Sequence, residues 1–244
     1  MKVSIERHPH WACIFLKGDG PAPGVVDADT LRDFRDALEE LASTPDLRCL
    51  LVEAAACGGA SLPALSRVTG DEMLGQATLF AALLQSIHDF RTPVVFWARG
   101  HQQGAALGLA TASDIILGDR TSAFSLPEAT VSMAPILISP WLARRVAPAL
   151  FRRLALSGAV LDADSALRIG LIDEIYNGPG FPPQLARILK SSPASVRKIK
   201  NLSRFTPPPE IVQEFLDFMS NSQVQEDLAT IAAEGSPTGR GEGP

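Results

Sequence analysis

The chain has 244 residues, 46% of them hydrophobic and 20% charged, with a formal net charge of -5. This size and composition predict one globular domain with a helical appendage rather than two full domains. The acidic balance argues against a nucleic acid or an anionic membrane as the general partner. No apolar run reaches the roughly 18 residues of a membrane span, and the amino terminus lacks the pattern of a signal peptide.

The cysteines and histidines indicate neither a disulfide framework nor a metal site. Cys13, Cys49 and Cys57 are odd in number and show no paired spacing, which favours a reduced, cytoplasmic setting. The close histidine pair, His8 and His10, has no third ligand nearby. We therefore expect no bound metal ion.

The amino-terminal half alternates strand and helix patterns. Strands are expected at 3–6, 12–16, 48–53 and 93–98, a helix from Asp29 or Thr30 to about Ala42, and a longer helix capped by Asp71 that runs past Ile87. Residues 18–24 form a Gly/Pro loop. Such alternation predicts an α/β fold with right-handed crossovers.

Beyond Pro135 the pattern becomes mostly helical. Helices are expected at 139–146, 148–156, 162–169, 183–190, 195–204 and 209–233, with one short strand at 172–175. Residues 235–244 contain no large apolar side chain, and we expect them to be flexible. The expected organisation is a core over 1–180, a helical region over 181–234 and a tail over 235–244.

Two glycine-containing loops each follow a strand. In the first, Cys57-Gly58-Gly59-Ala60-Ser61, paired glycines would let the backbone approach a ligand and aim an N–H group at an oxyanion. The second runs from Gly100 to Gly108 into a small-residue helix, whose first N–H groups and dipole favour negative charge. For the first loop a flexible connection is the simpler explanation, whereas for the second close helix packing explains the composition equally well.

Glu128 follows Pro127 among apolar neighbours, so its pKa should be raised toward the range that proton transfer near neutral pH requires. A plain helix-start carboxylate is the simpler alternative. His101, in the second loop, and His88, on the long helix, are the other titratable candidates, although each also fits a structural histidine. No serine has the G-x-S-x-G setting of a hydrolase nucleophile.

Together these segments resemble the crotonase (enoyl-CoA hydratase/isomerase) superfamily over nearly the whole chain. CGGASL at 57–62 is similar to the family's A-G-A-D-L loop. RGHQQGAALGLATASDIILG at 99–118 is similar to its N-G-x-A-x-G-G-G-x-x-L-A-x-x-x-D stretch. FSLPE at 124–128 matches F-x-x-P-E, and 154–175 matches the signature that ends in G-L-V-D-x-V.

The resemblance implies a crotonase-like ββα spiral with a C-terminal helical trimerisation region. It places the two oxyanion N–H groups on Ala60 and Ala105. The glycine-containing loops also offer Gly59, Gly104 and His101 as candidate substrate-binding residues. Hydratases of the family use two glutamates; the later maps onto Glu128. The substrate would be carried on coenzyme A or phosphopantetheine, with no other cofactor, and the oligomer would be a homotrimer or a hexamer.

The earlier glutamate of the family maps onto Gly108, and Ser61 replaces the usual Asp of the first loop. These departures resemble the dehydratases of polyketide β-branching cassettes, which also have a P-x-x-x-x-P-x-L-x-R-R stretch, here at 135–145. The resemblance implies a lyase that dehydrates a 3-hydroxy-3-methylglutaryl-type thioester on an acyl carrier protein. The alternatives are an acyl-CoA hydratase or isomerase, and a catalytically reduced homologue that serves as a binding subunit.

Overall fold

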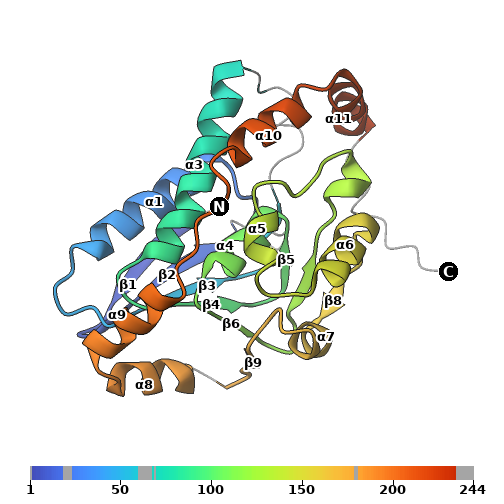
Figure 1. Ribbon diagram of the computed structural model, residues 1–244. Coiled ribbons are helices and arrows are strands. Elements are labelled where there is room, and N and C mark those ends of the chain that lie inside the picture. The colour runs from blue at the N-terminus through green and yellow to red at the C-terminus, as the bar shows by residue number, and fades with distance from the viewer. Residues whose placement is uncertain (1, 19–23, 60–67, 69, 179–180, 235–244) are drawn as a thin grey trace.

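The computed structural model describes residues 2–18, 24–59, 68, 70–178 and 181–234 (Figure 1). A six-stranded sheet is the centre of the fold. Its strands, in spatial order, are β1 (Lys2–Arg7), β2 (Trp11–Lys17), β3 (Cys49–Ala54), β4 (Val94–Ala98), β6 (Ile115–Gly118) and β9 (Glu174–Ile175). The first pair is antiparallel and all later pairs are parallel. The carboxyl-terminal ends of β3, β4 and β6 therefore lie at the same end of the sheet, where the loops that follow these strands meet.

A second, three-stranded sheet lies beyond these carboxyl-terminal strand ends. It consists of β5 (His101–Gln103), β7 (Ala123–Ser125) and β8 (Leu161–Asp162). The sequence pattern predicts a turn at 101–103, but these residues pair in parallel with β7. The pairing partner lies about twenty residues along the chain, so the local sequence does not signal it.

Helices α1 (Ala28–Ala42) and α3 (Gly70–Asp89) bury their apolar sides in the larger core cluster, with alternate residues of the central strands. α1 begins earlier than the capping residues Asp29 or Thr30 would give, because Asp27 is the N-cap and its carboxylate accepts from Thr30 N at 2.8 Å. α3 begins at Gly70, which places Asp71 in the first turn rather than at the cap.

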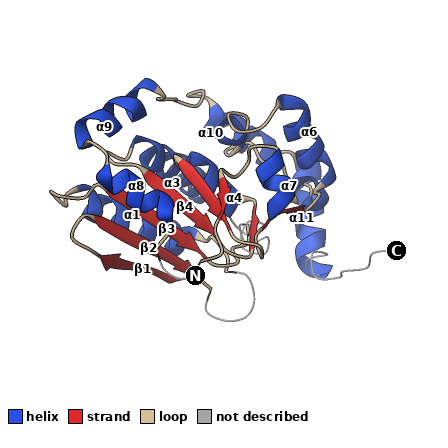
Figure 2. Ribbon diagram, turned by 90° about the horizontal axis from the view of Figure 1, so that it is seen from below, coloured by secondary structure: helices blue, strands red, loops and turns tan. Residues whose placement is uncertain are grey.

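Helix α8 (Pro183–Lys190) packs against the opposite face of the sheet. Strands β1 to β4 run side by side there (Figure 2). The buried cluster on this face contains Cys13, Cys49, Leu51, Val95, Trp97, Leu117 and Leu185. Leu185 belongs to α8, which contacts β3. The central strands β3 and β4 are thus buried on both faces, which agrees with their near-continuous apolar sequence.

The remaining helices lie between and after the strands from β5 onward. They are α4 (Ala105–Ala112), the 3-10 helix η1 (Glu128–Val131), α5 (Ser139–Leu142), α6 (Pro148–Ser157), α7 (Ala163–Arg168), α9 (Pro193–Leu202), α10 (Ile211–Met219) and α11 (Ser222–Glu234). The single helix predicted at 209–233 is wrong. The helix is interrupted at Asn221, which separates α10 from α11. The Asn221 side chain accepts hydrogen bonds from the backbone N–H groups of Gln223 and Val224 and so caps the start of α11.

The C-terminal helical region predicted from the sequence is present, and polar and apolar contacts attach it to the core. Lys200 on α9 donates to Asp114 Oδ2 at 2.6 Å and to the carbonyl of Thr92 at 3.1 Å. α10 packs against α3 (Figure 1). Residues 235–244, predicted to be a flexible tail, lie outside the described residues.

Candidate active site

A cavity of about 640 Å³ opens between α1, α3, the β5–α4 turn and η1. Its wall contains apolar side chains from several elements, with polar residues of α1 and α3 among them. The apolar lining residues include Met73, Ala77, Phe80, Val131, Met133, Ile136, Leu137, Ile138 and Phe215. Gly59, Gly104, Ala105 and Glu128 also line it. A mostly apolar cavity with a few convergent polar groups is typical of a small-molecule site.

The two glycine-containing loops lie against each other at this cavity. Cys57 N donates to the carbonyl of His101 at 2.8 Å, and Gln103 N donates to the carbonyl of Cys57 at 3.0 Å. A Cβ atom placed on Gly59 would lie 3.9 Å from the Gly104 Cα atom. Ala60, the first predicted oxyanion residue, follows Gly59 directly but lies outside the described residues. Its role stays a prediction.

Gly104 turns the chain from β5 into α4. Its φ of 49° and ψ of -114° lie in a region that only glycine occupies readily. Ala105 is then the first residue of α4 and lines the cavity. Within the described part of the chain no carbonyl accepts from the Ala105 N–H group. This N–H group, at the positive end of a helix, is suited to binding a developing oxyanion.

Glu128 lies directly beside this turn. A Cβ atom on Gly104 would be only 2.9 Å from Glu128 Oε1. Oε2 is buried and has no hydrogen-bond partner among the described residues. Burial raises the pKa of Glu128 to about 7, partly offset by a hydrogen bond from its own backbone N–H group. The carboxyl group can therefore accept and return a proton near neutral pH.

The turn that carries Glu128 is tied to the C-terminal helices. Met133 N donates to the carbonyl of Glu128 at 2.8 Å. Ser132, in the left-handed region at φ 56°, donates from its hydroxyl to Asp227 Oδ2 at 2.7 Å. Asp227 belongs to α11. Phe215 of α10 reaches the cavity itself. The C-terminal region thus helps to shape the site from within the same chain.

The position of the family's earlier glutamate is filled by packing. A Cβ atom on Gly108 would lie 2.4 Å from Ile138 Cγ2 and 3.2 Å from Phe80 Cζ. Real Cβ atoms do not approach carbon atoms so closely, so no side chain fits at 108 while Ile138 stays in place. The sequence reveals the missing carboxylate, but the isoleucine that occupies its space comes from a segment thirty residues away.

The two candidate histidines are held by protein groups. The His101 ring lies 2.9 Å from Ser125 Oγ through Nε2 and 3.0 Å from Gln103 Nε2 through Nδ1, and it is not among the described residues that line the cavity. Burial lowers its pKa. His88 is buried and its Nε2 atom accepts from Phe205 N at 3.0 Å, which makes it a structural histidine.

The remaining chemistry of the described residues is limited. The thiols of Cys13, Cys49 and Cys57 are buried, and burial raises the pKa of each, so they are poor nucleophiles. Within the described residues, no three His, Cys, Asp or Glu side chains come together as a metal site would require. Across the same residues, every helix is too short or too polar to cross a membrane.

Residues 20–204 match the model of the family described as enoyl-CoA hydratase/isomerase. The chain belongs to this family. The match confirms the resemblance to crotonases and covers both glycine-containing loops, Glu128 and Gly108.

Among the proteins that this chain is similar to, the carnitinyl-CoA dehydratase of Proteus mirabilis is 26% identical over 218 residues, 84% of this chain and 82% of that protein. The cyclohexa-1,5-dienecarbonyl-CoA hydratase of Thauera aromatica is 26% identical over 236 residues, covering 94% and 89% of the two chains. An enoyl-CoA hydratase structure from Mycobacterium avium superposes with a TM-score of 0.83 at 22% identity, covering 97% and 98%. The predicted crotonase-like fold is confirmed.

Proposed function

We propose that this protein is a lyase that removes water from a β-hydroxyacyl thioester, with Glu128 as its acid/base group. The observation that carries the proposal is the buried Glu128 carboxyl group beside the Gly59–Gly104 contact. The ionised carboxylate takes the proton from Cα, the Cβ–O bond breaks, and the same carboxyl group returns the proton to the departing hydroxide. The products are an enoyl thioester and water, and the carboxylate is regenerated.

The thioester oxygen, which becomes negative as Cα loses its proton, would be bound by the N–H groups of Ala105 and Ala60. A donor of this kind lowers the barrier by about 3 kcal/mol. The Ala105 N–H group is at the start of α4 and on the cavity wall, which supports its part. Ala60 is proposed from its place in the sequence after Gly59.

Coenzyme A is the favoured carrier of the acyl group. The relatives named above are a carnitinyl-CoA dehydratase and a cyclohexa-1,5-dienecarbonyl-CoA hydratase. Gly108 and the 135–145 stretch support a second candidate, the dehydration of a 3-hydroxy-3-methylglutaryl group on an acyl carrier protein. In either case we propose a homotrimer or hexamer located in the cytoplasm.

The proposal is tested by Glu128→Gln, which keeps the shape of the side chain but cannot carry the proton. We expect dehydration of 3-hydroxybutyryl-CoA to fall by at least about 10²-fold, the lower end of what acid–base catalysis contributes. Glu39→Gln, on the exposed side of α1, is the matched control and should keep wild-type activity. Near-wild-type activity of Glu128→Gln would refute the assignment.

Three further measurements separate the alternatives. Turnover of the 3-hydroxy-3-methylglutaryl group on a carrier protein, compared with the same group on coenzyme A, decides between the two carriers. Incorporation of ¹⁸O from labelled water into an enoyl-CoA identifies a hydratase, because an isomerase adds no water. Absence of thioester turnover, with binding of a partner protein intact, would favour the binding subunit.

A further inference from the structure

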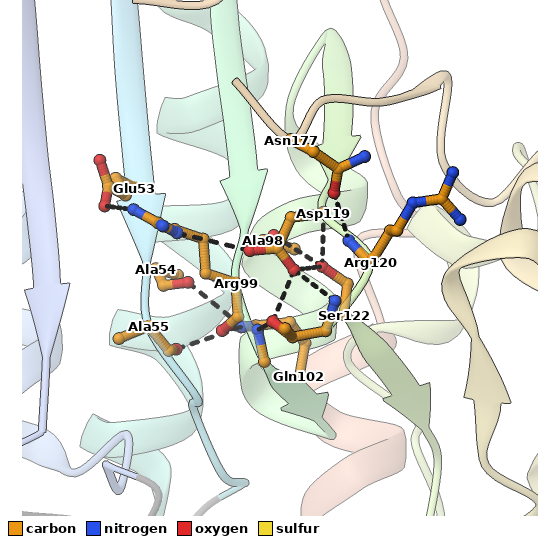
Figure 3. Close-up of polar contacts among 12 residues, drawn as sticks. Glu53, Ala54, Ala55, Ala98, Arg99, Gln102, Asp119, Arg120, Ser122 and Asn177 are labelled. Atoms are coloured by element: carbon orange, nitrogen blue, oxygen red, sulfur yellow. Dashed lines mark hydrogen bonds and ion pairs between the residues drawn. The ribbon is translucent and has the colours of Figure 1, made fainter. Parts of the chain in front are cut away.

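A buried amide side chain links the ends of two central strands. Gln102, on β5, is fully buried. Because side chains alternate along a strand, it points away from its neighbours His101 and Gln103. Its Nε2 atom lies 3.3 Å from the carbonyl oxygen of Ala54 and 3.1 Å from that of Ala55, at the end of β3. The same Nε2 atom lies 3.1 Å from the carbonyl oxygen of Arg99, just after β4 (Figure 3).

These three carbonyl groups lie where the two loops that form the site leave β3 and β4. Ala54 and Ala55 lead into the loop that contains Gly59, and Arg99 leads through β5 to Gly104 and the N–H group of Ala105. An isolated parallel β-bridge between Cys57 and Gln102 links the two loops farther along toward the cavity. The Gln102 amide group therefore adds a side-chain link to the backbone hydrogen bonds that already join the two loops.

The Arg99 side of this link is itself fixed. The Arg99 guanidinium group lies 3.1 Å from Glu53 Oε1 on β3 and 3.5 Å from Asp119 Oδ2 after β6. The Ser122 hydroxyl donates to the carbonyl of Ala98 at 2.8 Å and accepts from Asp119 N at 2.8 Å. Figure 3 shows this network around the end of β4. The backbone that Gln102 contacts thus has little freedom to shift.

The amide oxygen of the Gln102 side chain is unfavourably placed. Gln102 Oε1 is buried and has no hydrogen-bond partner among the described residues, and an unpartnered buried oxygen is unfavourable by about 1–3 kcal/mol. Gln102 also stands at the alanine of the N-G-x-A motif that residues 99–102 resemble. A small apolar residue would avoid the unpaired oxygen but would lose all three contacts of Nε2, so we assign the amide group to the link that these contacts make between the loops.

We infer that Gln102 is a positioning residue, which holds the first loop at Gly59 against the β5–α4 turn and so keeps the Ala105 N–H group in place for the thioester oxygen. This inference rests on the proposed function. It adds a residue that does not touch the substrate and acts through the backbone of both loops.

The test is Gln102→Met, which keeps the length of the side chain and removes the donor. The first readout is the absorption of cinnamoyl-CoA at saturation, because hydrogen bonds to its thioester oxygen polarise the conjugated system and move the band to longer wavelength. We expect the wild type to shift the band and Gln102→Met to shift it less. We also expect kcat on 3-hydroxybutyryl-CoA to fall by about 10-fold to 10²-fold with KM little changed, as for a loss specific to the transition state.

Gln85→Met is the matched control. Gln85, on α3, also donates from Nε2 to a backbone carbonyl, that of Phe205, and also has a buried, unpartnered Oε1 atom within the described residues. This variant should keep the band shift and kcat of the wild type. Thermal unfolding of both variants checks that they fold. Where Gln102→Met does not fold, Gln102→Asn, whose amide group is one methylene nearer the backbone, should give a reduced shift.

Equal band shifts in the wild type and in the folded Gln102 variants would overturn the inference and leave the proposed lyase intact. Loss of the shift in Gln85→Met as well would also overturn it, because the effect would then follow any buried amide. Absence of a shift in the wild type itself would overturn the proposed oxyanion site and the role of Gln102 with it.

Discussion

Glu128 should destabilise the fold whenever it is ionised, and Glu128→Gln should relieve that effect. Burial raises its pKa from an ordinary value of 4.5 to about 7, which corresponds to about 3 kcal/mol. Below pH 4.5 the carboxyl group is protonated in both the folded and the unfolded chain, so it has no effect. Between pH 4.5 and 7 the unfolded chain loses this proton first, and the stability of the wild type falls. Above pH 7 the full destabilisation is present.

The amide of Glu128→Gln cannot ionise, so its advantage over the wild type should grow from pH 5 to pH 8. Chemical denaturation at both pH values measures the free energy of unfolding directly. At pH 8 an advantage of about 3 kcal/mol corresponds to a rise in melting temperature of roughly 6–12 °C for a chain of this size. The same variant should be nearly inactive, so stability and activity should move in opposite directions.

Glu39→Gln is the control for the loss of one negative charge, because Glu39 is exposed on α1. It should change the pH dependence of stability little. The reasoning fails if Glu128→Gln has the same advantage at pH 5 and pH 8, or if it is less stable than the wild type at pH 8. Either result would mean that the folded chain solvates the charge better than its burial indicates.

Three other substitutions test the packing of the site and of the C-terminal region. Gly104→Ala should lower kcat by about 10²-fold, because its methyl group would lie 2.9 Å from Glu128 Oε1 and the positive φ disfavours alanine. Unchanged kinetics of this variant would contradict the described geometry. Gly108→Ala should lower the free energy of unfolding by about 1–3 kcal/mol. In an Ile138→Ala background this loss should largely disappear, and an equal loss in both backgrounds would count against the contact. Lys200→Met should lower the free energy of unfolding by about 3 kcal/mol, measured by denaturation, because it leaves the partly buried Asp114 carboxylate without its ion-pair partner. A fully stable variant would show that the ion pair is dispensable.

The sequence predicts the central elements of the fold well, since their signals are local. The apolar strand at 93–98 and the helical spacing of Met73, Ala77 and Phe80 correspond to β4 and α3. Predictions fail where a contact distant in sequence decides the structure. β5 exists because it pairs with β7, and the break before α11 depends on a cap by Asn221 within a pattern that otherwise continues.

The candidate site shows the same division. The raised pKa of Glu128 agrees with the prediction from its apolar neighbours, since burial is its largest cause. Sequence reasoning misses Gln102 and Ile138. The first gives no local sign that its amide group meets carbonyl groups at the ends of β3 and β4, and the second acts on a glycine thirty residues away.

The contact between Gly108 and Ile138 also limits how the enzyme can change in evolution. A glutamate cannot be acquired at 108 while the isoleucine remains, and truncating the isoleucine first opens a void in the cavity wall. Each single step is therefore unfavourable, and only the paired change leads to a site with two carboxylates. The history of this lineage should be visible as covariation between these two positions, with small residues at 138 wherever an acidic residue stands at 108.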